Sequence, residues 1–236
     1  ENGIQDPGEI CFVAKTFDTG AGDAPEGITL GDFNEDGLLD IAVGNVDSDD
    51  VGIFLNLGEE QFSIPALFSL QGLDPTAIAT ADFNGDAHLD LVVANGSTND
   101  VEILLGDGEG AFLLSGGVFP VGDTPFTLAV GDIDGLNGPD LVVGNKNSSN
   151  LTILFQDGAG GFVESPSSPL PAGGEPIDLV LEDFDAAFLD IVVVNDNLGP
   201  VNFFFGQSNG ETNATPFLIT DQRVPTGVAA GDINGD

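Results

Sequence analysis

The segment 32–40, DFNEDGLLD, places oxygen-bearing side chains at alternate positions between two apolar stretches. Carboxylate or amide residues occupy its positions 1, 3, 5 and 9, and a glycine occupies position 6. In a tightly coiled loop, side chains at positions 1, 3 and 5 converge on one point, and the backbone carbonyl of position 7 can join them. Coordination by oxygen alone, rich in carboxylates, is what a hard cation such as Ca²⁺ takes, with about six to eight ligands. We therefore predict a calcium site formed by Asp32, Asn34, Asp36, the Leu38 carbonyl and Asp40.

A second loop, 82–90, repeats the pattern as DFNGDAHLD. Its predicted ligands are Asp82, Asn84, Asp86, the His88 carbonyl and Asp90. Ala87 replaces the glycine, which costs about 1 kcal/mol if this residue needs a positive φ. No Cys or His side chain falls at a ligand position of either loop, so zinc and copper are excluded. The loops also differ from an EF-hand, which needs Glu at position 12, where this chain has Val43 and Val93.

Three further loops keep only part of the pattern. The third has acids at Asp132, Asp134 and Asp140, with Leu136 where the third acid belongs, although Asn137 could swing in. The fourth is one residue short, so we expect its acids to cap a turn and hairpin without metal: Asp183, Asp185 and Asp190. The fifth lacks a closing ligand and contains Asp232, Asn234 and Asp236. Asp, Asn and Gly also simply form turns, but that alternative does not explain acids at alternate positions in successive loops.

The loops recur with a fixed period, which indicates an internal repeat. Their leading residues, spaced 50, 50, 51 and 49 apart, are Asp32, Asp82, Asp132, Asp183 and Asp232. Two further markers keep this phase: Phe12, Phe62, Phe112 and Phe162, and Asn45, Asn95, Asn145 and Asn195. Three markers in phase make chance implausible, so the repeat covers essentially the whole chain.

One repeat predicts four short strands, over residues 76–83, 90–95, 101–106 and 111–121. The second, DLVVAN, is a continuous apolar run typical of a buried strand, and turn-forming residues join the four. No segment shows sustained helical periodicity. Four strands at a period near 50 predict an all-β propeller of four-stranded antiparallel blades. We expect blades at 23–72, 73–122, 123–173 and 174–223, the end of a preceding blade at about 1–22, and the start of another at 224–236.

The phase of the two ends indicates a fragment of a larger ring. A small closed ring sharing one blade between its termini is the alternative, but the middle strands of that blade would be missing. The chain contains no Met, which also indicates a processed form or a fragment.

Composition restricts the partners. The formal net charge is −37, so nucleic acid and anionic membranes, which need a positive field, are excluded as default partners. With 41% hydrophobic residues the chain can still form a core. No apolar run of eighteen residues predicts a membrane span. One His and one Cys leave no Ser/His or Cys/His arrangement, so we expect no enzyme, although carboxylate pairs can in principle cleave glycosides.

The segments VEILLGDGEGAF, VGDTPFTLAVGDIDG and PDLVVGN resemble FG-GAP or VCBS-type repeats, including the calcium-binding blades of integrin α-subunit heads. The resemblance implies a β-propeller, usually seven-bladed, with Ca²⁺ in the loop that joins the first two strands of a blade. It also implies an extracellular or cell-surface protein that acts in adhesion or recognition.

In integrin-like propellers the face opposite the calcium loops binds partners. Candidate residues there for a protein or glycan ligand are Asn45, Asp47, Asn95, Asn99, Asn145, Asn147, Asn195 and Asn197. The alternative is that the repeated asparagines cap tight turns. Three functions remain open: an adhesion or recognition module, a calcium-stabilised structural spacer of a larger surface protein, and part of a polysaccharide-acting enzyme.

Overall fold

The computed structural model describes residue 16 and the ranges 24–184, 186–196, 201–207, 212–213 and 225–231. Strands and turns make up this part of the chain, and none of its residues is helical. The described residues accordingly contain no helix that is long and apolar enough to cross a membrane. The prediction of an all-β fold is confirmed. The pieces expected at 1–22 and 232–236, with Cys11 and Phe12, lie outside the described residues.

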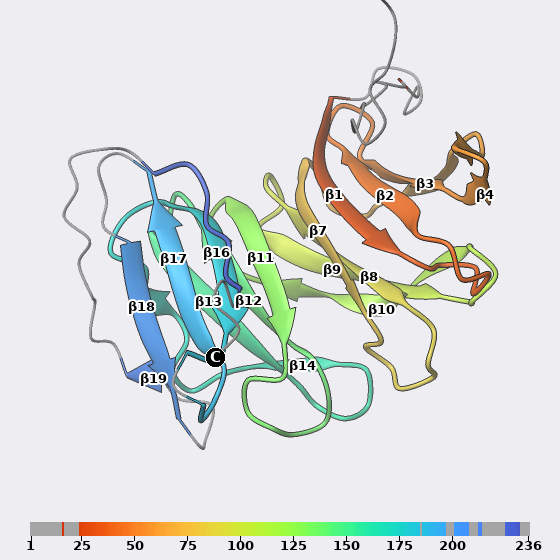
Figure 1. Ribbon diagram of the computed structural model, residues 1–236. Coiled ribbons are helices and arrows are strands. Elements are labelled where there is room, and N and C mark those ends of the chain that lie inside the picture. The colour runs from red at the N-terminus through yellow and green to blue at the C-terminus, as the bar shows by residue number, and fades with distance from the viewer. Residues whose placement is uncertain are drawn as a thin grey trace, which may run out of the picture.

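Four antiparallel sheets follow one another along the chain, and we call them blades 1 to 4 (Figure 1). Blade 1 has the order β1 (Pro25–Gly31), β2 (Asp40–Asn45), β3 (Asp50–Phe54), β6 (Ala66–Ser69), and a separate hairpin, β4 (Asn56–Gly58) with β5 (Gln61–Phe62), follows β3. Blade 2 has β7 (Pro75–Ala81), β8 (Asp90–Asn95), β9 (Asp100–Gly106) and β10 (Phe112–Pro120).

Blades 3 and 4 repeat this order. Blade 3 has β11 (Pro125–Gly131), β12 (Asp140–Asn145), β13 (Asn150–Gln156) and β14 (Phe162–Glu164), and β15 (Leu170–Pro171) also pairs with β13. Blade 4 has β16 (Pro176–Glu182), β17 (Asp190–Asn195), β18 (Val201–Gly206) and β19 (Thr212–Asn213). The four strands expected over 76–121 correspond to β7, β8, β9 and β10.

The first strands of the blades, β1, β7, β11 and β16, lie beside one another. Each begins at a proline that pairs with the asparagine ending the second strand, and the register shifts immediately afterwards. Proline cannot donate to a ladder and is tolerated at the first residue of a strand. The shift re-aligns the strand, so that its last residue pairs with the aspartate that closes the acidic loop.

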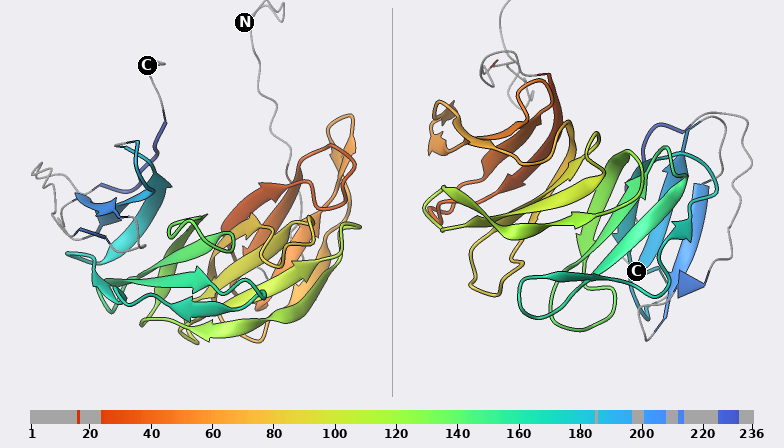
Figure 2. Two further views of the ribbon diagram at one scale, coloured as in Figure 1. Left: turned by 90° about the horizontal axis from the view of Figure 1, so that it is seen from below. Right: turned by 180° about the vertical axis from the view of Figure 1, so that it is seen from behind.

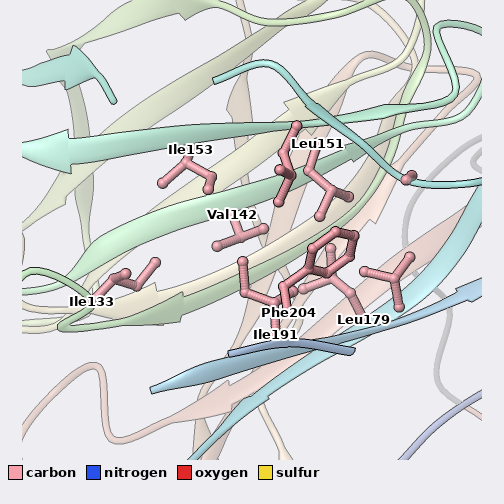
Figure 3. Packing of buried hydrophobic residues seen from close by; sticks show 10 residues of the cluster. Ile133, Val142, Leu151, Ile153, Leu179, Ile191 and Phe204 are labelled. Atoms are coloured by element: carbon pink, nitrogen blue, oxygen red, sulfur yellow. The ribbon is translucent and has the colours of Figure 1, made fainter. Parts of the chain in front are cut away.

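The core lies between the blades, because the second strands are buried on both faces. All six residues of β8, β12 and β17 are buried, which suits their β-branched sequences. One cluster lies between blades 3 and 4 and contains Val142, Ile153, Leu179, Ile191 and Phe204 (Figure 3). Two similar clusters join blades 1 and 2 and blades 2 and 3.

The four blades form an open arc, with blade 1 at one end and blade 4 at the other (Figure 2). The predicted propeller architecture of four-stranded antiparallel blades is therefore confirmed for the described residues. The size of the complete ring stays a prediction.

Candidate metal centres

The aspartate at position 9 of each acidic loop is a buried backbone clamp. Asp40, Asp90, Asp140 and Asp190 begin the second strands and are at most 1% exposed. One carboxylate oxygen accepts an N–H from inside the acidic loop, as Asp90 Oδ2 does from Phe83 at 2.8 Å. The other accepts an N–H from the residue 16 positions later, as Asp90 Oδ1 does from Gly106 at 2.9 Å. The remaining three clamps repeat this pattern.

The first loop is a tight coil in which side-chain oxygens accept backbone N–H groups. Asp32 accepts the N–H groups of Asp36 at 3.0 Å and Gly37 at 2.8 Å, one on each oxygen. Asp36 accepts the Leu38 N–H at 2.9 Å, and its other oxygen accepts a hydrogen bond from Asn34 Nδ2 at 3.0 Å. These hydrogen bonds coil the loop and hold Asn34 against Asp36, but the carboxylates of Asp32, Asp36 and Asp40 do not form a group whose oxygens all lie within 4.8 Å of one another.

The second loop has nearly the same network. Asp82 accepts the Gly85 and Ala87 N–H groups at 2.7 and 2.9 Å, and Asn84 donates to Asp86 at 2.8 Å. Ala87 has φ of 73°, so this residue does adopt the positive φ that glycine has at the same position of the first loop. Glu35, the fourth residue of the first loop, also has a positive φ of 57°.

The third loop brings three acids together. One oxygen from each of Asp132, Asp134 and Asp140 lies within 4.8 Å of the others, and this is the one such group of three metal-ligating side chains among the described residues. Asn137 does not complete it, because its amide donates to the Gln156 carbonyl at 3.2 Å. Leu136, in place of the third acid, is exposed.

The fourth loop keeps the clamp, but Ala187 replaces the acid of position 5. Asp183 accepts the Ala187 N–H at 3.0 Å, which fits the expected turn-capping role. Asp185 lies outside the described residues, as do Asp232, Asn234 and Asp236 of the fifth loop.

The electrostatics of the loops favour a cation from solution. Burial raises the pKa of Asp140 to about 6 and also raises the pKa of Asp90. The surrounding protein therefore does not fully offset the cost of burying either charged carboxylate. Backbone hydrogen bonding from His88 lowers the pKa of Asp86, which keeps it ionised. Lys146 is the only lysine or arginine in the described part of the chain, and it follows the far end of β12, 3.7 Å from Asp196. The all-oxygen donor set and the uncompensated carboxylates fit Ca²⁺.

Neighbouring loops are linked directly. His88 Nδ1 of the second loop lies 2.5 Å from Glu35 Oε1 of the first, and this hydrogen bond raises the pKa of the imidazole. Gln156 Nε2 of blade 3 donates to the Phe83 carbonyl in the second loop at 2.8 Å. Each of these contacts joins a loop directly to a residue of the adjacent blade.

On the opposite face lie the repeated asparagines, for which the sequence left a ligand-binding role and a turn-capping role open. Asn45, Asn95, Asn145 and Asn195 are fully buried, so their side chains do not reach the surface. The first three donate across the turn between the second and third strands, as Asn95 does to Asp100 at 2.8 Å. Asp47 and Asn147 are exposed, and the Asn147 amide donates to Thr124 Oγ1 at 2.7 Å. Asn197 lies outside the described residues.

Two structural roles on this face were not predicted from sequence. Asp49 and Asn99 adopt positive φ and accept the N–H groups of Asp74 and Thr124, both at 2.9 Å, in the linker to the next blade. Glu102, 1% exposed, accepts N–H groups from the linker residues Gln71 and Gly72 at 2.9 and 3.1 Å. The 50-residue spacing of positions 49 and 99 could have indicated their shared role from the sequence. No sequence signal indicated that Glu102 is buried.

Comparison with protein families decides the type of repeat. Residues 32–93 and 82–135 match the FG-GAP-like repeat. Residues 32–135 are FG-GAP-type repeats. The resemblance to FG-GAP repeats is thereby confirmed for these residues, and blades 3 and 4 continue the same architecture. No curated protein matches the chain significantly.

Solved structures similar to these FG-GAP-type repeats support the propeller fold. A protein from Lactobacillus plantarum has a TM-score of 0.63 at 18% identity, over 81% of this chain and 54% of that one. Virginiamycin B lyase from Staphylococcus aureus has a TM-score of 0.59 at 17% identity, over 89% and 61%. BBS1N in complex with ARL6DN has a TM-score of 0.53 at 18% identity, over 80% and 55%. The chain thus spans little more than half of each relative.

Proposed function

We propose that this chain is a calcium-binding propeller module that recognises a protein or a glycan outside the cell or at its surface. The observation that carries the proposal is the array of acidic loops along one face. No lysine or arginine is paired with the acids of the first three loops in the described residues, and the oxygens of Asp132, Asp134 and Asp140 converge. Ca²⁺ would be held by the first two loops through the predicted ligands and by these three acids in the third. Bound there, it would supply the positive charge that the loops lack.

Thermal melts test the calcium part of the proposal. A ligand that binds only the native state raises the melting temperature. We expect a rise with about 1 mM Ca²⁺, a level suited to weak extracellular sites, and its loss with excess chelator. Asp36→Ala combined with Asp86→Ala should remove most of the rise, because each substitution deletes a predicted ligand of one loop.

The matched control is Asp47→Ala combined with Asp123→Ala, which removes the same charge from exposed sites away from the loops. The control should keep the full calcium-dependent rise. An equal loss in both double variants would mean that Ca²⁺ acts through general charge screening. No rise in the wild type would mean that the loops are only turns.

The recognition part is tested by screening protein and glycan arrays with calcium and then with chelator. Chelator-sensitive binding supports a recognition module. The similar fold of BBS1N, solved in complex with ARL6DN, supports a protein partner as one class to include. We also propose that the module is not an enzyme, because its one His forms an exposed pair with Glu35 that brings no Ser, Thr or Cys nucleophile of the described residues beside the imidazole.

A structural spacer is the second candidate, and the opposite face favours it. Several polar side chains there are engaged in contacts between turns and linkers, including Asn99 with Thr124 and Ser97 with Asp74. Such contacts stiffen the array of blades rather than leave groups for a ligand. Calcium-dependent stability without any bound partner in the arrays would support the spacer over the recognition module.

A further inference from the structure

In blades 2 to 4, the linker that enters the blade passes beside its third strand, on the face opposite the acidic loops, and we call this place the linker gap. In the linker gap of blade 2, the buried carboxylate of Glu102 accepts the N–H groups of Gln71 and Gly72 at 2.9 and 3.1 Å. In that of blade 4, the buried amide of Asn202 donates to the Ala172 carbonyl. A side chain of the third strand therefore occupies both of these gaps.

The linker gap of blade 3 contains a cavity instead of a side chain. Thr152 lies 50 positions after Glu102 on the equivalent strand, and its shorter side chain accepts the Asn145 amide at 2.9 Å. On the linker side, Gly122 matches Gly72, because a Cβ added to either glycine would collide with the asparagine that ends the second strand. Thr152 and Gly122 line a cavity of about 230 Å³, which is room for several water molecules.

Three hydrogen-bond donors belong to the wall of this cavity. The Gly122 N–H has no acceptor in the described part of the chain, whereas the equivalent N–H of blade 2 donates to Glu102. Asn145 Nδ2 donates to Asn150 Oδ1 at 2.8 Å as well as to Thr152. The Nδ2 group of Asn150 and the hydroxyl hydrogen of Thr152 therefore remain as donors.

One strong acceptor and three apolar residues complete the wall. Ser168 Oγ donates to Glu164 Oε1 at 2.7 Å, and Glu164 Oε2 is left to accept a hydrogen bond from a ligand. The apolar surface comes from Pro120, Val121 and Pro169. A small apolar cavity wall with a few polar groups that fix orientation is the usual composition of a ligand site.

The groups on this wall suit an uncharged ligand that carries hydroxyls. A hydroxyl both donates and accepts, so a ring with several hydroxyls can use the donors and the Glu164 carboxylate together, while its C–H groups pack on the apolar residues. An anion is disfavoured by Glu164 and by the net charge of −37. A cation is disfavoured because most of the polar groups are donors, which a cation cannot use.

We propose that the linker gap of blade 3 binds one uncharged sugar unit of a glycan. Glu164 accepts from sugar hydroxyls, and Gly122 and Asn150 donate to them. The cavity, about 230 Å³, is smaller than the about 300–1,000 Å³ of sites for drug-sized ligands, so it suits a single ring. This inference rests on the recognition part of the proposed function and names its ligand class. The gap lies between blades 2 and 3, so it does not depend on what precedes blade 1 or follows blade 4.

Amide NMR titrations of the chain in about 1 mM Ca²⁺ test the site. Glucose, galactose, mannose and N-acetylglucosamine are the neutral probes. Glucuronic acid and glucosamine are matched charged probes, because they differ from glucose and from N-acetylglucosamine in charge. We expect at least one neutral sugar to shift the Gly122 amide resonance until it saturates, and to bind more tightly than its charged counterpart.

Thr152→Glu should abolish the shift, because it puts into the gap the side chain that Glu102 places there one blade earlier. Gln61→Glu adds the same charge at an exposed site of blade 1 and should leave binding unchanged. Glu164→Gln should weaken binding about tenfold, the loss expected for one hydrogen bond to a charged group. Glu164 is exposed, so this variant keeps the test valid even if Thr152→Glu fails to fold. The dispersion of each spectrum shows whether the variant is folded.

A neutral sugar that binds folded Thr152→Glu as tightly as the wild type would overturn the proposal, because its site would lie elsewhere. The absence of a saturable shift with every neutral sugar would also overturn it. Tighter binding of glucuronic acid or glucosamine than of the neutral counterpart would show that the ligand class is wrong. None of these results touches the calcium part of the proposed function, which the melts test without sugar. Chelator-sensitive binding on the arrays would still support the recognition part.

Discussion

The clamp made by Asp90 has a cost of removal that can be worked out from the structure. Asp90→Ala leaves the N–H groups of Phe83 and Gly106, now 2.8 and 2.9 Å from the carboxylate, without their acceptor. A hydrogen bond to a charged group contributes about 1.5–3 kcal/mol net, which gives about 3–6 kcal/mol for two. Burial raises the pKa of Asp90, so part of this gain is offset by desolvation of the charge. We expect a loss of about 2–4 kcal/mol.

The matched variant is Asp86→Ala in the same loop. Its hydrogen bonds to His88 N and Asn84 Nδ2 are exposed, so in chelator we expect a loss of about 1 kcal/mol or less. Urea unfolding followed by circular dichroism in excess chelator measures both variants. In calcium, both should lose the stabilisation contributed by the second loop.

A cost of less than about 1 kcal/mol for Asp90→Ala in chelator would contradict the proposed clamp, since two hydrogen bonds to a charged group are worth more than that. Equal losses of stability in the two variants in chelator would also contradict it, because the clamp would then be no more important than the coil.

Three further predictions concern single positions. The raised pKa of Asp140, about 6, means that without metal the native state holds a proton that the unfolded chain has lost. The contribution of Asp140 to stability should therefore be greatest below about pH 4 and fall by about 1–3 kcal/mol as the pH rises through 6. Melts in chelator across this range check it against Asp140→Ala, and a rise specific to the wild type would contradict it. Ala87→Gly should raise the melting temperature by about 1–2 °C, because the positive φ costs alanine more than the added chain entropy costs glycine; a lower value would refute the strain. Gly122→Ala should cost about 1–3 kcal/mol in urea unfolding, because its Cβ would lie 2.6 Å from Cγ of buried Asn145. Gly231→Ala, with open space around it, is the neutral control.

The strands were predictable because their signals are local. The run 90–95 matches β8 at both ends, since a β-branched segment between turn-forming residues has few other stable conformations. The segment 111–121 was the most irregular of the predicted strands, and β10 indeed shifts register between Leu113 and Gly117. The periodic markers then placed the equivalent strands of the other blades.

The acidic loops were recognisable from the sequence. The sequence did not show which of their acids lie in the exposed coil and which form the buried clamp. The sequence treats Asp36 and Asp40 as equal ligands, whereas the structure shows one in an exposed coil and the other in a buried clamp to Asn56, 16 residues later. The buried amides such as Asn95 could not be separated from surface amides, because the same residue type serves both. Burial and long-range hydrogen bonds determine these roles, and residue spacing predicts neither of them.

The separation of coil from clamp has a consequence for how such repeats can diverge. In the fourth loop Ala187 replaces the acid of position 5 and one residue is deleted, yet Asp190 still accepts the Phe184 and Gly206 N–H groups. Folding and ion binding are therefore specified by different residues of the same short loop. A blade can lose its cation site, or acquire one by substitutions at positions 1, 3 and 5, without rebuilding the junction between its strands. Under the proposed calcium-binding function, an array of such blades can be adjusted one site at a time to the amount of calcium in its surroundings.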